Sequence, residues 1–283
     1  MFSSRPESAF KWTRKSIIRN LQTYRYEPVQ PYLLREFSRV LQSEYFLDVG
    51  ANIGYYSLLI GSEGGCDRVF AYEPMPSAHR ELVKNVYRNG LEDIVVCHPL
   101  AVSSRSGSSS LDILGEMAGG NALSSTAVHH SQVIRTEEVK TTTLDEMHDF
   151  SGCRATLKID VEGHEYQVIK GAENLLQSNQ ILLQVELLDR SRTFEDVLDL
   201  LARLGFTWVF SAGPDKYFTN DQNVSDRIFE AVERPLDCFI GDFKKPLYVK
   251  SRCLPGIGFE LSPRLLGMIP SFLRPSFRRK CKR

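Results

Sequence analysis

The sequence lacks an excess of charge of either sign, a long apolar run and any close pair of cysteines, and each absence excludes a class of protein. Its 35 lysine and arginine residues equal its 35 aspartate and glutamate residues, so the formal charge is zero. This balance argues against general nucleic-acid binding, which requires a basic face that neutralises phosphates. The six cysteines form no CxxC pair and no histidine lies at zinc-finger spacing from them, so reduced, mostly buried thiols are expected.

No stretch approaches the roughly 20 apolar residues that a membrane-spanning helix needs. The first residues, MFSSRPESAFKW, lack the apolar core of a secretory signal. These two absences predict a soluble, cytoplasmic enzyme. At 283 residues, of which 42% are hydrophobic and 25% charged, the chain is long and apolar enough for one large or two small domains with a buried core.

Hydrophobic periodicity divides the chain into three parts. Residues 1–44 carry two apolar stripes at helical spacing and predict a helical flank. Residues 45–250 alternate short apolar runs with helical segments, which is typical of an α/β domain with a mainly parallel sheet. Residues 251–283 form a basic, proline-containing tail. The seven candidate strands are Tyr45–Val49, Arg68–Tyr72, Ile94–Pro99, Ala155–Val161, Ile181–Leu187, Phe206–Phe210 and Cys238–Gly241.

Two segments between these strands are well marked. Apolar residues follow Ser77 at helical spacing and the run stops at Gly90, which predicts a helix with a glycine cap. A long polar stretch, Ser103–Thr143, separates the third and fourth strands, and a connection of this length predicts an extra hairpin or a mobile substrate loop. The pair His129–His130 in this stretch has no ligand pattern and is interpreted as ordinary loop residues.

The stretch FLDVGANIGYYSLLI, residues 46–60, predicts a strand, a glycine turn and a helix. In a doubly wound sheet, ligands bind beyond the carboxyl ends of the strands, where this turn lies. A nicotinamide fingerprint would offer three glycines as GxGxxG, whereas here Gly50 and Gly54 have GxxxG spacing and follow Asp48 in the strand. This combination favours S-adenosylmethionine (SAM), since a carboxylate can attract its ammonium group and bare backbone can accommodate its amino-acid tail.

The next two strand ends are consistent with an adenosine-containing cofactor. Glu73 ends the second strand, about 25 residues after Asp48, where a carboxylate can accept hydrogen bonds from both ribose hydroxyls. The third end, HPLAV with Ala101, is expected beside the adenine ring. Neither feature distinguishes SAM from other adenosine cofactors.

Charged residues gather at the end of the fourth strand, in the stretch LKIDVEGHE. Charges are costly to bury in a central strand unless they open into a cleft. Alternation places Lys158 and Asp160 on one side of the strand, where they can pair, while Glu162 and His164 fall in the following turn. Glu186, at the end of the probable neighbouring strand, could join them. This cluster predicts a catalytic site, and its structural alternative is an ion-pair cluster that caps the next helix.

The series FLDVGANIGYYS, VFAYEP, TTTLDE, LKIDVEGHE and LLQVE, in this order over roughly residues 45–210, resembles the FkbM-type family of SAM-dependent methyltransferases. The resemblance implies the class I, Rossmann-like α/β fold, with a seven-stranded, mainly parallel sheet covered by helices on both faces. It also implies O-methylation of a hydroxyl on a sugar, glycan or other natural product. By motif position, Asp48, Gly50, Asn52 and Gly54 would hold the methionine portion of SAM and Glu73 its ribose, and residues 160–164 would face the methyl acceptor.

The sequence is compatible with several mechanisms and functions. An acceptor hydroxyl needs help to lose its proton, and His164 or Asp160 could act as the general base. Alternatively, Asp160, Glu162 and Glu186 could bind Mg²⁺, which would lower the pKa of the hydroxyl; the metal-free route is favoured. The other functions considered are an N-methyltransferase, a catalytically silent SAM-fold binding protein and a nicotinamide-dependent oxidoreductase.

The acceptor is expected to be a small molecule or a glycan, with no nucleic acid involved. The final segment, RPSFRRKCKR, interleaves basic residues with phenylalanine and could contact an anionic membrane surface. A solubilising terminus is the alternative interpretation of this tail.

Overall fold

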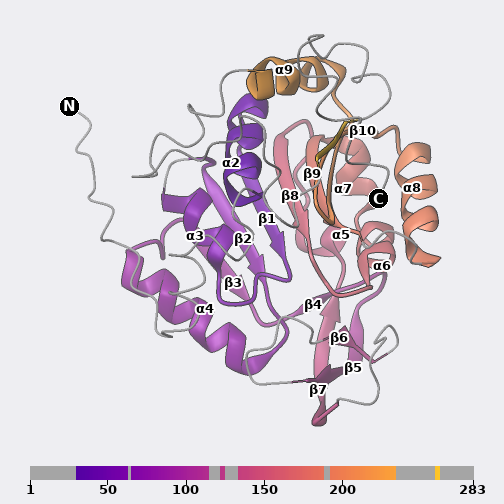
Figure 1. The fold of residues 1–283 in the computed structure, drawn as a ribbon. Helices are drawn as coiled ribbons and strands as arrows, with labels where there is room; N and C mark the ends of the chain where they lie inside the picture. Colours follow the sequence, from indigo (N-terminus) through magenta and orange to yellow (C-terminus); the bar gives the residue numbers. More distant parts are fainter. Residues whose placement is uncertain are drawn as a thin grey trace.

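The computed structural model describes residues 30–62, 65–114, 122–124, 133–187, 192–233 and 259–261. An eight-stranded sheet in the order β12-β10-β11-β9-β8-β1-β2-β3 organises these residues (Figure 1). Its strands are β1 (Tyr45–Val49), β2 (Arg68–Tyr72), β3 (Val95–His98), β8 (Arg154–Ile159), β9 (Gln180–Glu186), β10 (Thr207–Ala212), β11 (Asp215–Thr219) and β12 (Phe259–Leu261).

The topology is that of a class I, Rossmann-like sheet. Strands β3, β2, β1, β8 and β9 are parallel neighbours. Strand β11 lies between β9 and β10 and runs antiparallel to both, and β12 adds to the outer edge of β10. Without β12, the seven remaining strands have the order 3-2-1-4-5-7-6 along the sheet. The predicted fold class is therefore confirmed.

Six of the seven expected strands form, with ends shifted by a few residues. The seventh position is filled by β11, which the sequence analysis did not identify, and the expected strand Cys238–Gly241 lies outside the described residues. Residues Gly213 and Pro214 form the tight turn that joins β10 to β11, and Gly213 adopts a φ of +63° there. A glycine-proline turn between two aromatic-rich runs is a hairpin signal that could have identified this strand.

Helices cover both faces of the sheet and bury one apolar core on each. Residues of α2, α3, α4 and α9 share a core cluster with Phe46 and Leu182 on one face. Residues of α5, α6, α7 and α8 share a second cluster with Leu47 and Leu183 on the other. The bounds are α2 (Gln30–Leu41), α3 (Tyr55–Ser62), α4 (Pro76–Asn89), α5 (Leu144–Met147), α6 (Glu165–Lys170), α7 (Glu173–Ser178), α8 (Arg192–Arg203) and α9 (Gln222–Glu233).

Two local expectations about helices are confirmed. In α2, the apolar stripe that includes Leu34 and Phe37 is buried against the sheet. In α4, the helix ends at Gly90, whose φ of +63° and backbone hydrogen bonds to preceding carbonyls form a left-handed cap. The first apolar stripe of the N-terminal flank and the basic tail beyond residue 261 lie outside the described residues. Among the described helices, none has the length and apolar character to cross a membrane.

The long connection after β3 forms a second, smaller sheet, which confirms the predicted extra hairpin. Its strands are β4 (Ala101–Val102), β5 (Gly107–Ile113), β6 (Ala122–Leu123) and β7 (Arg135–Thr142), in the order β4-β7-β5-β6. It projects beyond the end of the main sheet (Figure 1). A core cluster that includes Met75, Ala78 and Val139 attaches it to the start of α4. The pair His129–His130 lies outside the described residues.

Candidate active site

The turn after β1 requires glycine at two positions because other parts of the protein pack directly against its backbone. Gly50 adopts a φ of +83°, and a Cβ built on it would lie 1.8 Å from the carbonyl oxygen of Asp160. Gly54 adopts a φ of +91°, and its Cβ would lie 2.5 Å from Cδ1 of Leu82. Both conformations strain any other L-residue. The turn is thus held against β8 on one side and α4 on the other.

Asp48 is buried beneath this turn with half of its carboxylate unsatisfied. Its Oδ2 accepts hydrogen bonds from the backbone N–H of Ser57 at 3.1 Å and from the Ser57 hydroxyl at 2.6 Å. Its Oδ1 is buried and has no hydrogen-bond partner among the described residues. Burial raises the pKa of Asp48, while the charge of Lys158 opposes the rise. A buried acceptor without a donor suits a cationic or N–H-bearing ligand.

Glu73 directly follows β2, and its side chain is hydrogen-bonded to the turn that follows β1. Its Oε2 accepts from the backbone N–H of Asn52 at 2.8 Å, and its Oε1 accepts from the N–H of Met75 at 2.9 Å. Asn52 reaches this position in a left-handed conformation with a φ of +50°. Burial raises the pKa of Glu73 to about 7, despite the two backbone donors. Each carboxylate oxygen retains a second lone pair, so the group can still accept hydrogen bonds from two ligand hydroxyls.

The end of β8 carries the predicted pair. Lys158 Nζ lies 2.9 Å from Asp160 Oδ2, which confirms the expected pairing, and 4.6 Å from the centroid of the Tyr56 ring. Burial disfavours the ionised form of Asp160, but Lys158 and a hydrogen bond with Glu186 outweigh it, and its pKa falls below the usual value. Burial and the charge of Asp160 raise the pKa of Glu186 to about 9. These opposite shifts favour an ionised Asp160 that accepts a hydrogen bond from a protonated Glu186.

Three further residues, Tyr56, Gln184 and Asp215, extend this cluster and were not predicted from the sequence. Gln184 donates through Nε2 to Asp215 Oδ1 at 2.6 Å and to the Tyr56 hydroxyl at 3.4 Å. Asp215, on β11, lies opposite Glu186 in the strand register. Gln184 is fully buried, and in the part of the chain that the structure describes its Oε1 has no hydrogen-bond partner. Because β11 inserts beside β9, residues distant in sequence meet the end of β8.

Glu162 lies at the solvent side of the cluster in a left-handed turn, with a φ of +55°. Partial burial and the charge of Asp160 raise its pKa to about 7. One carboxylate oxygen from each of Asp160, Glu162 and Glu186 can be chosen such that all three lie within 4.8 Å of one another. Carboxylate oxygens are the ligands that Mg²⁺ prefers, so these three residues could hold a divalent cation.

The remaining predicted residues are also buried. His164 is buried, its Nε2 lies 2.9 Å from the hydroxyl of Ser103, and no described residue pairs with its Nδ1. Burial lowers the pKa of His164 to about 4, so the ring is neutral at pH 7. Ala101, expected beside the adenine ring, is buried in β4 among the apolar residues that attach the small sheet. The structure thus brings together Asp48, Lys158, Asp160, Glu162 and Glu186 most closely.

Comparison with known proteins agrees with this architecture. Residues 48–207 match the family model described as the methyltransferase FkbM domain. The chain belongs to the FkbM methyltransferase family. The matched segment runs from Asp48 to the first residue of β10 and includes the glycine turn, Glu73 and the acidic cluster.

Among curated proteins, the FkbM-family chain is similar to the hexuronic acid methyltransferase AglP of Haloferax volcanii. The two are 29% identical over 147 residues, which cover 51% of this chain and 56% of that protein. The chain thus spans about half the length of this relative.

Solved structures also match, among them two methyltransferases. A methyltransferase FkbM from Methylobacillus flagellatus KT aligns with a TM-score of 0.46 and 16% identity, over 75% of this chain and 56% of that chain. An O-methyltransferase from Bacillus cereus, in complex with SAH, aligns with a TM-score of 0.41 and 12% identity, over 72% of this chain and 84% of that chain.

Proposed function

We propose that this FkbM-family methyltransferase transfers a methyl group from SAM to a hydroxyl oxygen of a sugar or glycan. The observation that carries the proposal is the position of Asp160, paired with Lys158 at 2.9 Å and with its backbone packed directly against Gly50 of the glycine turn. A carboxylate in this position can accept the proton of an acceptor hydroxyl. The relative named for hexuronic acid methylation supports a sugar as the acceptor.

The turn and the end of β2 fit SAM. The unpartnered Oδ1 of Asp48 suits its ammonium group, and Glu73 suits its ribose hydroxyls. Gly50, Asn52 and Gly54 shape the backbone that would hold the methionine portion. When bound, SAM supplies an electrophilic methyl group, so the protein has to orient the acceptor and take up its proton.

Asp160 is the proposed general base. An alcohol is a poor nucleophile at neutral pH, and a positioned base typically contributes 10²- to 10⁴-fold in rate. Lys158 donates to Asp160 Oδ2 and favours its ionised form, and Glu186 forms a second hydrogen bond with Asp160, so both neighbours fix the carboxylate in place. His164 is the second candidate base: its Nδ1 has no hydrogen-bond partner among the described residues, but its ring is buried and its Nε2 already contacts the Ser103 hydroxyl at 2.9 Å.

A bound Mg²⁺ is the alternative means of activating the hydroxyl. Asp160, Glu162 and Glu186 would be its ligands, and the cation would lower the pKa of the acceptor hydroxyl. Lys158 already supplies a positive charge 2.9 Å from Asp160. Since a cation beside Asp160 weakens the attraction for a second one, the metal-free route is favoured.

Calorimetric titration with SAM and S-adenosylhomocysteine, with NAD as a control, tests the cofactor. Micromolar SAM binding that is lost in Glu73→Ala is the expected result. Transfer of labelled methyl groups to oligosaccharides that contain hexuronic acid, with and without EDTA, then tests the acceptor and the metal. A folded protein that binds NAD in place of SAM, or that binds SAM and methylates amines but no hydroxyl, would overturn the proposal.

A further inference from the structure

The outer face of helix α4 exposes two large apolar side chains one turn apart. Tyr87 is 74% exposed and Val83 is 43% exposed. Among the residues that the structure describes, only Ile134 is a further large apolar residue with this degree of exposure. Residues four positions apart are neighbours on a helix surface, so Val83 and Tyr87 form one continuous patch. A continuous apolar patch favours an interaction surface, whereas exposed apolar residues scattered singly are normal.

The same face carries three cations, and none of the exposed residues of α4 is acidic. Arg80, Lys84 and Arg88 follow one another at a spacing of four residues, so they lie along the apolar patch. Lys84 is paired with Glu81 at 2.9 Å. Neither arginine has a salt bridge with a described residue, and Arg88 only approaches the side-chain oxygen of Asn85, at 3.5 Å. The face is therefore positive although the formal charge of the whole chain is zero.

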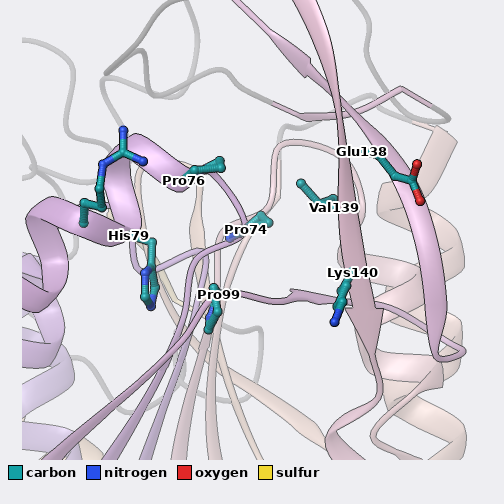
Figure 2. Close-up of a pocket in the computed structure, with 8 residues that line it drawn as sticks. Pro74, Pro76, His79, Pro99, Glu138, Val139 and Lys140 are labelled. Carbon is teal, nitrogen blue, oxygen red and sulfur yellow. The ribbon is translucent and has the colours of Figure 1, made fainter.

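The opposite face of α4 holds this patch on the outside of the protein. Leu82 and Val86 are buried in the core beneath the helix, and His79 lines a pocket together with Pro99, between α4 and the small sheet (Figure 2). No other described helix or strand lies on the outer side of α4 in Figure 1. The outward side chains are thus available to a partner that approaches from solution.

The shape and chemistry of this face fit the surface of an anionic membrane. The convex side of a helix cannot enclose a small molecule, but it can lie along a flat surface, over about 12 Å from Arg80 to Arg88. Basic side chains attract anionic headgroups. A tyrosine beside them suits the boundary between headgroups and acyl chains, because its ring is apolar and its hydroxyl is polar. A nucleic acid is a poorer match, since it requires a larger basic face than three side chains provide.

We propose that this surface attaches the protein to membranes that contain anionic lipids. We name it the α4 face, and its residues are Arg80, Val83, Lys84, Tyr87 and Arg88. The three cations contact the headgroups, and the two apolar side chains enter the interface between headgroups and acyl chains. Because α4 covers one face of the sheet, whereas the candidate active site lies at the carboxyl ends of the strands, attachment through α4 does not cover the site.

The test is sedimentation of the whole chain with vesicles of equal parts phosphatidylserine and phosphatidylcholine, at low and at high salt. Vesicles of phosphatidylcholine alone are the uncharged match. The expected result is binding to the anionic vesicles at least about tenfold stronger than to the uncharged ones, and weaker as salt rises. Arg80→Glu combined with Arg88→Glu should weaken this binding at least about tenfold, because each basic residue near such a surface contributes about fivefold. Tyr87→Ser should weaken it several-fold, and Tyr87→Phe should retain it.

Two matched controls separate the α4 face from the rest of the surface. Arg203→Glu combined with Arg227→Glu changes the net charge by the same amount, at exposed positions of α8 and α9, which lie away from α4 in Figure 1. Ile134→Ser matches Tyr87→Ser, because Ile134 is 68% exposed and directly precedes β7. Both controls leave the basic tail unaltered and should bind the anionic vesicles within about twofold of the unmodified protein, since salt screens distant charges.

Absence of vesicle binding, equal binding to both kinds of vesicle, or controls as damaging as the α4 variants would overturn the inference. Unchanged binding of the α4 variants would also overturn it and would place the contact elsewhere, as in the basic tail. Binding of heparin without binding of vesicles would overturn it in favour of a soluble polyanion. None of these measurements involves SAM, so their outcome is independent of the proposed function.

Discussion

The backbone of Gly50 approaches Asp160 so closely that a Cβ on Gly50 would lie 1.8 Å from the Asp160 carbonyl oxygen. The backbone N–H of Asp160 in turn donates to the carbonyl of Val49 at 3.0 Å. The turn that would hold SAM and the residue that would take up the acceptor proton are therefore fixed to each other through their main chains. We expect a substitution at either position to affect both the binding of SAM and the uptake of the acceptor proton.

Gly50→Ala tests this link. The added methyl group would have to displace the end of β8, and a φ of +83° is unfavourable for alanine. We expect a loss of about 2–5 kcal/mol in the free energy of unfolding, measured by urea denaturation, and a loss of SAM binding. Gly90→Ala is the control, since Gly90 also has a positive φ but no atom within 4 Å of an added Cβ; it should cost about 1–2 kcal/mol and leave SAM binding intact. Equal effects of both variants would contradict the link.

Glu73 is expected to make stability and cofactor affinity respond to pH in opposite directions. Its pKa is raised from 4.5 to about 7 in the folded protein, so between these values the folded state binds more protons than the unfolded state. Stability then falls as pH rises through this range, by up to about 3 kcal/mol. SAM affinity should rise over the same range, because ribose hydroxyls donate to the ionised carboxylate.

Glu73→Gln provides the measurement. The difference in free energy of unfolding between the unmodified protein and the variant, followed from pH 4.5 to pH 8, should shift in favour of the variant as pH rises. The variant should also lose most of its SAM affinity, with no pH dependence near 7. A constant difference across the range would show that Glu73 titrates at its ordinary value.

The parallel part of the fold could be predicted from sequence because its strands are continuous apolar runs that end in turn residues. Phe46 and Leu47, for example, face opposite cores and are both fully buried. Strand β11 was not predicted because it begins with Asp215 and Lys216, which are residue types that are normally exposed. Both are buried here, where Asp215 accepts from Gln184 and Lys216 donates to the carbonyl of Gly213.

Only the part of the site that is formed by residues at the end of one strand, β8, could be predicted from the sequence. The Lys158–Asp160 pair follows from alternation along β8, and its geometry is confirmed. The contact of Gln184 with Tyr56 and Asp215 depends on where β11 inserts, which no local pattern specifies. The enclosure of His164 depends in the same way on Ser103, which lies 61 positions earlier in the chain.

The hydrogen bond between Asp160 and Glu186 predicts a difference between two amide variants. Asp160→Asn removes the proposed base and should lower kcat at least about 100-fold, with SAM affinity changed little. Glu186→Gln keeps a hydrogen-bond donor toward Asp160, as the protonated carboxyl does, and should retain kcat within about tenfold. Single-turnover rates with labelled SAM, with and without EDTA, measure both. If the three carboxylates instead bind a catalytic metal, Glu186→Gln should be as damaging as Asp160→Asn, and EDTA should abolish activity.

His164 offers the sharpest test of which group is the base. Burial lowers its pKa from 6.5 to about 4, so the folded state binds fewer protons than the unfolded state between these values. Stability should therefore fall by up to about 3 kcal/mol as pH drops from 6.5 to 4, and His164→Gln should lose this dependence in urea denaturation.

For activity, a base with the pKa of Asp160 predicts a kcat that does not fall near pH 6.5. His164→Gln and Ser103→Ala should both reduce kcat modestly and by similar factors, because each breaks the contact between His164 Nε2 and the Ser103 hydroxyl. A pH–rate limb near pH 4 that disappears in His164→Gln but persists in Ser103→Ala would instead assign the base to His164. In that case Asp160→Asn should retain the limb, because the carboxylate would then serve only to orient the acceptor.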